Sequence, residues 1–331
     1  MARTQAVPGL ALAAMIAVPA TVIGTSFPLA GAPAVAMVAG IGAGLVLRRR
    51  GRYARYHPGL AVAGRQVLQA GVVVLGLGLS LPEVAAVGAE SLPVLLGTLF
   101  VALAGAWLLG RSLRLHPETS LLIGVGTGIC GASAIAAVTS VVRPERSRVA
   151  YAMGTIFTFN LVAVAVYPAL GRLLGLSDRA FGLWAGTAIN DTSSVVAAAY
   201  AFGASAGDHA VVVKLARSLM IVPICAALHL WRARRLRSAP GPSGTRVLPL
   251  FIGGFLVASA LATTGAVPVS WQPAPAAASS FLITTALAGV GAALDVRAMR
   301  DAGLRPLVFG GILGVLVGTS GLALQSLTGR L

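Results

Sequence analysis

The stretches Gly-Thr-Gly-Ile-Cys-Gly-Ala-Ser at residues 126–133 and Gly-Thr-Ala-Ile-Asn-Asp-Thr-Ser-Ser at residues 186–194 place polar groups inside hydrophobic segments. Both begin with Gly-Thr-x-Ile, and both continue into small apolar residues that are typical of a helix, at 134–137 and 195–198. Amide, hydroxyl and carboxyl groups are costly in lipid unless they have partners or a function there. The two stretches therefore predict a substrate site within a membrane, as transporters build it.

The composition is typical of a membrane protein. Hydrophobic residues make up 57% and charged residues 10% of the chain, and the mean hydropathy is +0.88, whereas roughly a quarter of the residues of a soluble protein are charged. Windows of about 19 apolar residues predict about eleven segments: 7–26, 29–47, 66–88, 92–110, 119–142, 149–171, 181–203, 209–231, 247–267, 276–296 and 304–327. We expect an all-α polytopic membrane protein in which residues 1–331 form a single transmembrane transporter domain.

The formal charge of +16 comes from basic residues that lie in short connections between the segments. They cluster at 48–55, 111–114, 232–237 and 297–305, whereas the connections around 88–91, 203–208 and 265–275 contain neither Lys nor Arg. Such a bias marks the cytoplasmic side of a multi-span protein and differs from the single basic patch of a nucleic-acid-binding domain. We expect a multi-pass protein of the cell (inner) membrane with a cytoplasmic N-terminus, an external C-terminus and no nucleic-acid partner.

Signals of catalysis and of cofactor binding are weak. Cys130 and Cys225 lie in apolar segments, so no disulfide is expected, and metal-ligand spacings and phosphate-binding loops do not occur. Residues 203–207 match the Gly-x-Ser-x-Gly nucleophile pattern but lack the strand that should precede it. We interpret them as an external loop and expect no enzyme, no cofactor and no metal. An intramembrane serine hydrolase that uses Ser205 and His209 is the alternative.

Each Gly-Thr stretch is followed by another hydrophobic span, at 149–167 and 210–228, so the chain contains two related units. Inverted repeats with broken helices are common in secondary transporters. If segments 119–142 and 181–203 both cross the bilayer, the units are parallel and the connection 143–148 is external. If they are broken or re-entrant, the units are inverted and this connection is cytoplasmic. We favour the inverted arrangement, because polar non-helical backbone is tolerated at membrane depth where it lines a cavity.

Asp191 is the acidic residue that lies deep in a predicted segment. A carboxylate in the middle of a membrane helix costs roughly 3 kcal/mol on insertion scales, so it needs a cation, a proton or hydrogen-bond donors. One interpretation is a structural ion pair with Lys214 or Arg217. The other is that Asp191, with the amide and hydroxyl groups beside it, binds a coupling H⁺ or Na⁺ or organises the substrate site.

Lys214 is the only Lys of the chain, and Arg217 follows it on the same face of the predicted helix. The pair could snorkel to an interface, or it could bind an anion, with Arg217 as a planar fork and Lys214 as a point charge. The glycines of 126–133 allow an unwound backbone whose N–H groups converge on an anion in front of a helix. Close helix packing through small residues is the alternative for this stretch.

The two Gly-Thr stretches, the Lys-Leu-Ala-Arg run at 214–217 and the Gly-Leu-Gly-Leu-Ser-Leu element at 76–81 resemble the YeiH-type family, whose members are named as sulfate exporters. The resemblance covers nearly the whole chain. It implies a secondary transporter of the inner membrane, distantly similar to the bile-acid symporter and cation/proton antiporter folds, with inverted repeats and broken helices. It also makes sulfate or a sulfonate-derived anion the leading candidate substrate.

The sequence thus predicts an exporter of a small anion such as sulfate, working by alternating access in the lipid bilayer; a Na⁺- or H⁺-coupled organic anion symporter is the alternative. Asp191 is the predicted ion-coupling residue. The predicted substrate-binding residues are Thr127, Gly128, Cys130, Gly131, Ser133, Asn160, Thr187, Asn190, Thr192, Ser193, Ser194, Lys214 and Arg217. A homo-oligomer is compatible with these features.

Overall fold

The computed structural model describes residues 2–26, 32–235, 250–264, 273–293 and 304–331, and within these ranges it contains helices and no strand. The expected all-α architecture is therefore confirmed for the described residues. The elements are α1 (Ala2–Ser26), α2 (Ala32–Arg49), α3 (Tyr53–Val62), η1 (Ala63–Val67), α4 (Leu68–Leu75), η2 (Gly76–Gly78), α5 (Leu81–Ser112), α6 (Pro117–Gly128), α7 (Ala132–Val142), α8 (Arg146–Leu173), α9 (Asp178–Ala188), α10 (Thr192–Phe202), α11 (Ala204–Leu219), α12 (Ile221–Arg235), α13 (Leu250–Thr263), α14 (Pro273–Ala293) and α16 (Leu304–Leu327).

Among the described residues, 7 helices are long and apolar enough to cross a membrane. They are Ala6–Ile23, Tyr53–Gly78, Leu81–Ser112, Ser147–Leu173, Ala204–Leu228, Ala274–Ala293 and Arg305–Leu327. The remaining predicted segments correspond to α2, to α13 and to two helices that are interrupted, one between α6 and α7 and one between α9 and α10. The chain is therefore a membrane protein with several apolar helices, two of whose hydrophobic segments are not continuous.

Two predicted connections are wrong. Residues 88–91 lie inside α5, because the chain turns earlier, at Ser80. There the Ser80 hydroxyl accepts a hydrogen bond from the Glu83 N–H, and the Glu83 carboxylate accepts one from the Ser80 N–H, which together form a capping box. Residues 203–207 are not a loop either, since α11 begins at Ala204. The predicted basic residues Arg297 and Arg300 lie outside the described residues.

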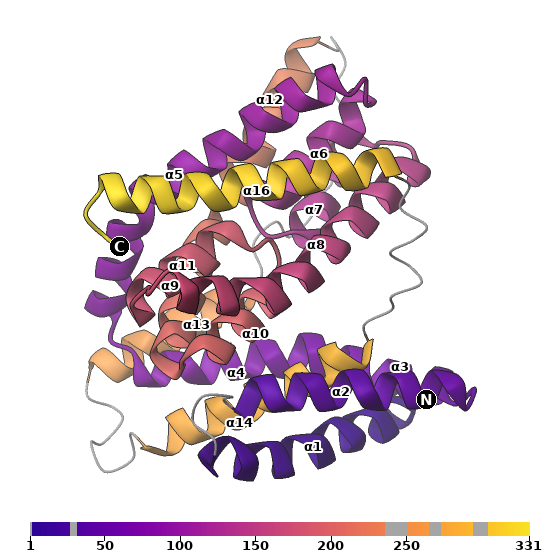
Figure 1. Cartoon of the computed structure of the whole chain (residues 1–331), viewed down its shortest axis with the longest axis vertical. Coiled ribbons are helices and arrows are strands. Elements are labelled where there is room, and N and C mark those ends of the chain that lie inside the picture. The colour runs from indigo at the N-terminus through magenta and orange to yellow at the C-terminus, as the bar shows by residue number, and fades with distance from the viewer. Residues whose placement is uncertain (1, 27–31, 236–249, 265–272, 294–303) are drawn as a thin grey trace.

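The helices form two groups (Figure 1). The scaffold group consists of α1 to α4, α13 and α14, and the hairpin group consists of α5 to α12 and α16. Within the scaffold group, α2 and α14 approach so closely that only glycine fits: a Cβ at Gly40 would lie 2.3 Å from the Ala288 carbonyl oxygen, and one at Gly44 would lie 2.4 Å from that of Ala292. Close packing through small residues is typical of helices in membranes.

An apolar cluster joins the two groups, and we call it the boundary cluster. From the hairpin group it contains Val196, Ala197, Tyr200, Val211, Val212 and Leu215, and from the scaffold group Met37, Leu68, Val72, Leu75, Ile252, Phe255, Ile283, Ala286 and Leu287. The members are buried side chains on α10 and α11 that pack against α2, α4, α13 and α14. The groups thus meet through side chains, whereas α2 and α14 meet through backbone.

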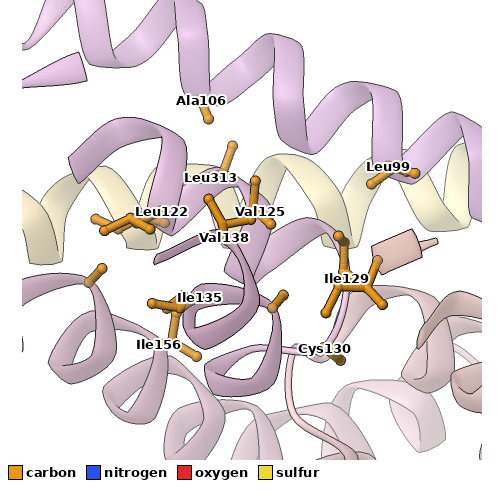
Figure 2. Close-up of a cluster of buried hydrophobic side chains, with 14 of the residues drawn as sticks. Leu99, Ala106, Leu122, Val125, Ile129, Cys130, Ile135, Val138, Ile156 and Leu313 are labelled. Carbon is orange, nitrogen blue, oxygen red and sulfur yellow. The ribbon is translucent and has the colours of Figure 1, made fainter. Parts of the chain in front are cut away.

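A second apolar cluster surrounds α6 and α7 (Figure 2). Leu122 and Val125 on α6 and Ile135 on α7 pack with Ile156 on α8 and Leu313 on α16. Apolar packing therefore fixes both halves of the first interrupted helix, and Ile129 and Cys130, which lie between the halves, belong to the same cluster.

Candidate functional site

The first interruption lies at residues 129–131. The α6 helix ends at Gly128, the N–H of Gly131 donates back to the Gly126 carbonyl at 2.9 Å, and α7 begins at Ala132. Gly131 has a φ of +65°, a backbone conformation that favours glycine because it has no Cβ. The glycine of the sequence motif therefore permits the break that the motif predicts.

The chain reverses direction at this break. Glu118, at the start of α6, forms an ion pair with Arg148, at the start of α8, and α7 ends at Val142, just before α8 begins at Arg146. The beginning of α6 and the end of α7 therefore lie at the same end of α8. We call residues 117–142 the first hairpin.

The second interruption, at residues 189–191, produces a second hairpin of residues 178–202. The rings of Phe181 on α9 and Phe202 on α10 stack with centroids 4.0 Å apart. A Cβ at Gly203 would also lie 3.0 Å from a carboxylate oxygen of Asp178. The start and the end of this segment are therefore neighbours, as in the first hairpin.

The two hairpins open toward opposite ends of α8. This helix has 28 residues and is about 42 Å long at 1.5 Å per residue. The first hairpin opens at its Arg148 end, and the second opens at its other end, where the Arg172 guanidinium donates to the Ala201 carbonyl at 2.6 Å. At the midpoint of α8, the Asn160 side-chain oxygen accepts a hydrogen bond of 3.3 Å from the Asp191 N–H, so the second tip lies there.

The tips of the two hairpins touch. A Cβ at Gly131 would lie 3.5 Å from the Cβ of Asp191 and 3.6 Å from the carbonyl carbon of Asn190. At this meeting point α6 and α9 end and α7 and α10 begin. The site therefore contains two negative helix C-termini and two positive helix N-termini.

Lys214 and Arg217 bind the carbonyl groups of both tips. Lys214 Nζ donates to the carbonyls of Ile129 and Ile189 at 2.9 and 2.8 Å. Arg217 donates from Nε to the Gly128 carbonyl at 2.7 Å, from Nη2 to that of Thr127 at 2.6 Å and from Nη1 to that of Ile189 at 3.4 Å. Both cations thus neutralise the C-terminal ends of α6 and α9. Because both side chains are 0% exposed, the snorkelling interpretation is wrong.

Asp191 caps α10 and does not pair with either cation. Its carboxylate accepts a hydrogen bond of 3.0 Å from the Ser193 N–H, and no salt bridge joins it to Lys214 or Arg217, all three of which are described residues. The predicted ion pair is therefore wrong in this structure, because backbone carbonyls occupy the cations. At the first tip, α7 has no side-chain cap.

The structure brings most, but not all, of the predicted site residues together. Thr127, Gly128, Gly131, Asn160, Asn190, Asp191, Lys214 and Arg217 meet at the tips. Cys130 and Ser194 are buried beside them in the chain, and Thr192 and Ser193 are half-buried in the first turn of α10. Thr187 donates its hydroxyl to the Leu183 carbonyl of its own helix, and Ser133 is exposed.

The sequence did not identify two features of this region. The carbonyls of Ile129 and Ile189 are ligands of Lys214, but backbone groups carry no sequence signal. Asp208 falls in the connection predicted around 203–208, whereas it lies in the span Ala204–Leu228 and accepts a hydrogen bond from the Tyr200 hydroxyl. The sequence could have indicated this, because Asp208 lies six residues before Lys214 in the same apolar run.

Comparisons with known proteins find bacterial relatives along nearly the whole chain. The family model described as Conserved hypothetical protein 698 matches residues 8–310. A UPF0324 membrane protein of Streptococcus pyogenes serotype M3 is 38% identical over 328 residues, which cover 96% of each chain. One of Streptococcus mutans serotype c is 35% identical over 340 residues, covering 99% of this chain and 98% of the relative. One of Fusobacterium nucleatum is 38% identical over 261 residues, covering 77% and 75%.

Proposed function

The chain belongs to the Conserved hypothetical protein 698 family, the YeiH-type family that its motifs resemble, and we propose that it is a secondary transporter of a small anion. It acts in the bacterial cytoplasmic membrane, with the two hairpin tips as its binding site. We also propose that it has no enzymatic activity. Labelling of Ser205 by a fluorophosphonate probe would argue for the hydrolase alternative.

The excess of positive charge at the tips carries this proposal. Lys214 and Arg217 are fully buried, and Asp191 is the carboxylate that lies with them at the tips. Two cations and one carboxylate leave a net formal charge of +1 at the tips, although backbone carbonyls bind both cations. Buried charges are stable only when they are paired or bonded. A substrate anion would complete the charge balance.

The N-terminus of α7 is the place where that anion would bind. The equivalent end of α10 holds the carboxylate of Asp191, whereas α7 has no side-chain cap. Helix N-termini attract anions through their free N–H groups and the helix dipole. Ser133, in the first turn of α7, is exposed, so the rest of the described chain does not cover this turn. The hydroxyls of Thr192 and Ser193 lie on the opposite tip and complete the proposed site.

Lys214 and Arg217 act on the anion mainly through their charge. An ammonium has three N–H bonds, and Lys214 directs two of them at carbonyls. A guanidinium has five, and Arg217 directs three of them at carbonyls. At most one N–H of Lys214 and two of Arg217 remain for a substrate. The bidentate fork expected from the sequence is therefore occupied by the backbone, and the cations position the tips as well as attracting the anion.

We further propose that the two units are inverted repeats and that about eleven segments lie in the membrane, with α2 and α13 crossing and the two hairpins re-entering. The opposite openings of the hairpins along α8 support this arrangement. Arg111 and Arg143 precede and follow the first hairpin near its open end, which favours the cytoplasm for that side. Arg172 and Arg179, at the other open end, are bonded to the Ala201 carbonyl and to Glu90. The N-terminus would then be cytoplasmic.

Two hairpins that open toward opposite sides would let equivalent movements expose the binding site to each side of the membrane in turn, as alternating access requires. Sulfate or a sulfonate-derived anion is the leading candidate substrate, and export is the proposed direction. Asp191 would organise the site as a fixed negative charge, and H⁺ or Na⁺ would serve as the coupling ion.

Reconstituted proteoliposomes test this proposal. Uptake of labelled sulfate, sulfite and taurine is measured with imposed pH and Na⁺ gradients, in the wild type and in Arg217→Ala. We expect one of the anions to accumulate only with the wild type. If folded wild-type protein moves none of them, or any other small anion, under any gradient, the proposal is wrong.

A further inference from the structure

Asp208 and Tyr200 form a polar contact in the second unit, away from the hairpin tips. The Tyr200 hydroxyl, on α10, donates a hydrogen bond to the Oδ1 atom of Asp208, on α11. The backbone at Gly207 lies against the Tyr200 ring, because a Cβ there would be 2.5 Å from its Cδ2 atom. Asp208 belongs to the membrane span Ala204–Leu228, where a carboxyl group is costly and usually functional.

Asp208 has no cationic partner among the described residues, and the ion pair nearest to it joins Arg179 to Glu90. The helix α11 packs mainly against α5, α9 and α10. Its side chains in the boundary cluster also contact the scaffold group, where α4, α13 and α14 carry no charged residue and α2 carries Arg48 and Arg49 in its last turn. The charged groups nearest this end are Glu90 on α5, Asp178 and Arg179 on α9, His209 on α11, and Arg330, which lines the same pocket as Glu90, Arg179 and His209. Lys214 and Arg217 lie further along α11, at the tips with Asp191. Arg179 is paired with Glu90, and the carbonyls occupy both cations of α11. The Tyr200 hydroxyl is the remaining direct partner.

The contact also lies at the edge of the boundary cluster. Tyr200 is 8% exposed and packs there with apolar side chains of the scaffold group, while Asp208 is half-buried and keeps some access to solvent. An ionised carboxylate is unfavourable beside such a cluster, whereas a neutral carboxyl group that keeps its hydrogen bond is tolerated. The protonation state of Asp208 therefore affects how favourable the contact between the scaffold group and the hairpin group is.

We propose that Asp208 is the group at which this carrier binds and releases a coupling proton, with Tyr200 as its positioning residue. The proposal rests on the anion transport proposed above. Asp191 does not take this role, because its carboxylate is occupied as the cap of α10 and lies beside two buried cations. A proton from water adds to Oδ2 of Asp208, Tyr200 keeps its own proton throughout, and release returns the bound proton to water.

The experiment compares wild type, Asp208→Asn and Tyr200→Phe in proteoliposomes. Uptake of labelled sulfate, or of whichever anion the wild type carries, is measured with an imposed pH gradient and also as exchange at equal pH. A trapped pH dye records proton movement. Asp178→Asn, which removes an exposed carboxyl group at the same end, and His209→Gln, which removes the neighbouring titratable side chain, are the matched controls. Size-exclusion profiles verify folding.

For Asp208→Asn we expect uptake driven by the pH gradient to fall by about tenfold or more, within the usual range of coupling effects, while exchange at equal pH continues. Tyr200→Phe should shift the pH profile of uptake, and both controls should behave as wild type. Gradient-driven uptake that persists in Asp208→Asn, or wild-type transport without any pH response, overturns this inference alone. Absence of anion transport by the wild type overturns it together with the proposed function.

Discussion

The tips of the first and second hairpins share the sequence Gly-Thr-x-Ile but differ at the helices that begin there. At both tips the C-terminal carbonyls of the incoming helix are bonded by Lys214 and Arg217. The outgoing helix α10 is capped by the carboxylate of Asp191, whereas α7 follows Gly131, which has no side chain to offer. The second tip therefore carries its own anion, and the first does not.

Under the proposed function, this difference would make the second tip structural and leave the first tip free to bind an anion. Both copies have the same arrangement of the backbone, namely two half-helices joined by a short break. The charge differs by the single residue that stands before the outgoing helix, Asp191 in one copy and Gly131 in the other. Substitutions at the tips can therefore abolish, reverse or preserve the asymmetry.

Removal of Arg217 should have the largest effect, because it removes bonds to both tips. Arg217→Ala leaves the carbonyls of Thr127 and Gly128 without their donors, and each lost bond to a charged group costs about 1.5–3 kcal/mol. We expect uptake to be lost and the thermal midpoint in detergent to fall. Arg217→Lys keeps the charge without the planar fork, so it should retain weakened anion binding. Equal affinity in all three proteins by calorimetry would contradict a role at the tips.

Asp191→Asn should have the next largest effect. Asn caps helices about as well as Asp, so α10 should still begin at Thr192 and the protein should still fold. The tips would, however, gain a second uncompensated positive charge, and a bound anion would be released more slowly. We expect transport to be abolished or uncoupled while anion binding remains or tightens, as measured by uptake and calorimetry. Wild-type transport with unchanged pH and Na⁺ dependence would show that the asymmetry of the tips is irrelevant.

Gly131→Ala should have a smaller, partial effect. A Cβ at this residue would lie 3.3 Å from the Ile156 Cγ2 atom, and the backbone, with φ +65° and ψ −126°, has a strained conformation outside the left-handed helical region that costs a non-glycine residue about 1–3 kcal/mol. Gly175→Ala is the matched control, because Gly175 also has a positive φ, +64°, but stands in open space. Both variants should lose stability, Gly131→Ala the more, and only Gly131→Ala should lose uptake. The same uptake in both would mean that the first tip tolerates displacement.

The orientation of the tips can be measured by labelling, without changing any charged residue of the tips. In a background without Cys130 and Cys225, Ser147→Cys and Ser177→Cys place exposed thiols at the two ends of α8. If the hairpins re-enter from opposite sides, a membrane-impermeant maleimide should label Ser147→Cys only from the cytoplasm and Ser177→Cys only from outside. Labelling of Ser147→Cys in intact cells would instead establish eleven full crossings and parallel units.

The breaks at the tips could be predicted from the sequence, but their geometry could not. Glycine and polar residues inside an apolar run indicate an interruption, and Gly131 and Asp191 lie at the two breaks. An apolar run of this length fits either one crossing or two half-helices that return, and only tertiary contacts such as the Phe181–Phe202 stack distinguish them. The partners of Lys214 are carbonyls, which every residue has. The turn at Ser80 was missed because a window of about 19 residues averages over a short cap signal.

The close approach of α2 and α14 restricts how the helices of the scaffold group can slide against one another. Because Gly40 and Gly44 lie directly against carbonyls of α14, sliding either helix by one residue would bring a side chain into the opposing backbone. The scaffold group therefore keeps a fixed register at this contact. The boundary cluster, by contrast, consists of side chains that can change rotamer, such as Val196 and Leu287. Rigid-body displacement during a transport cycle would consequently take place along α10 and α11.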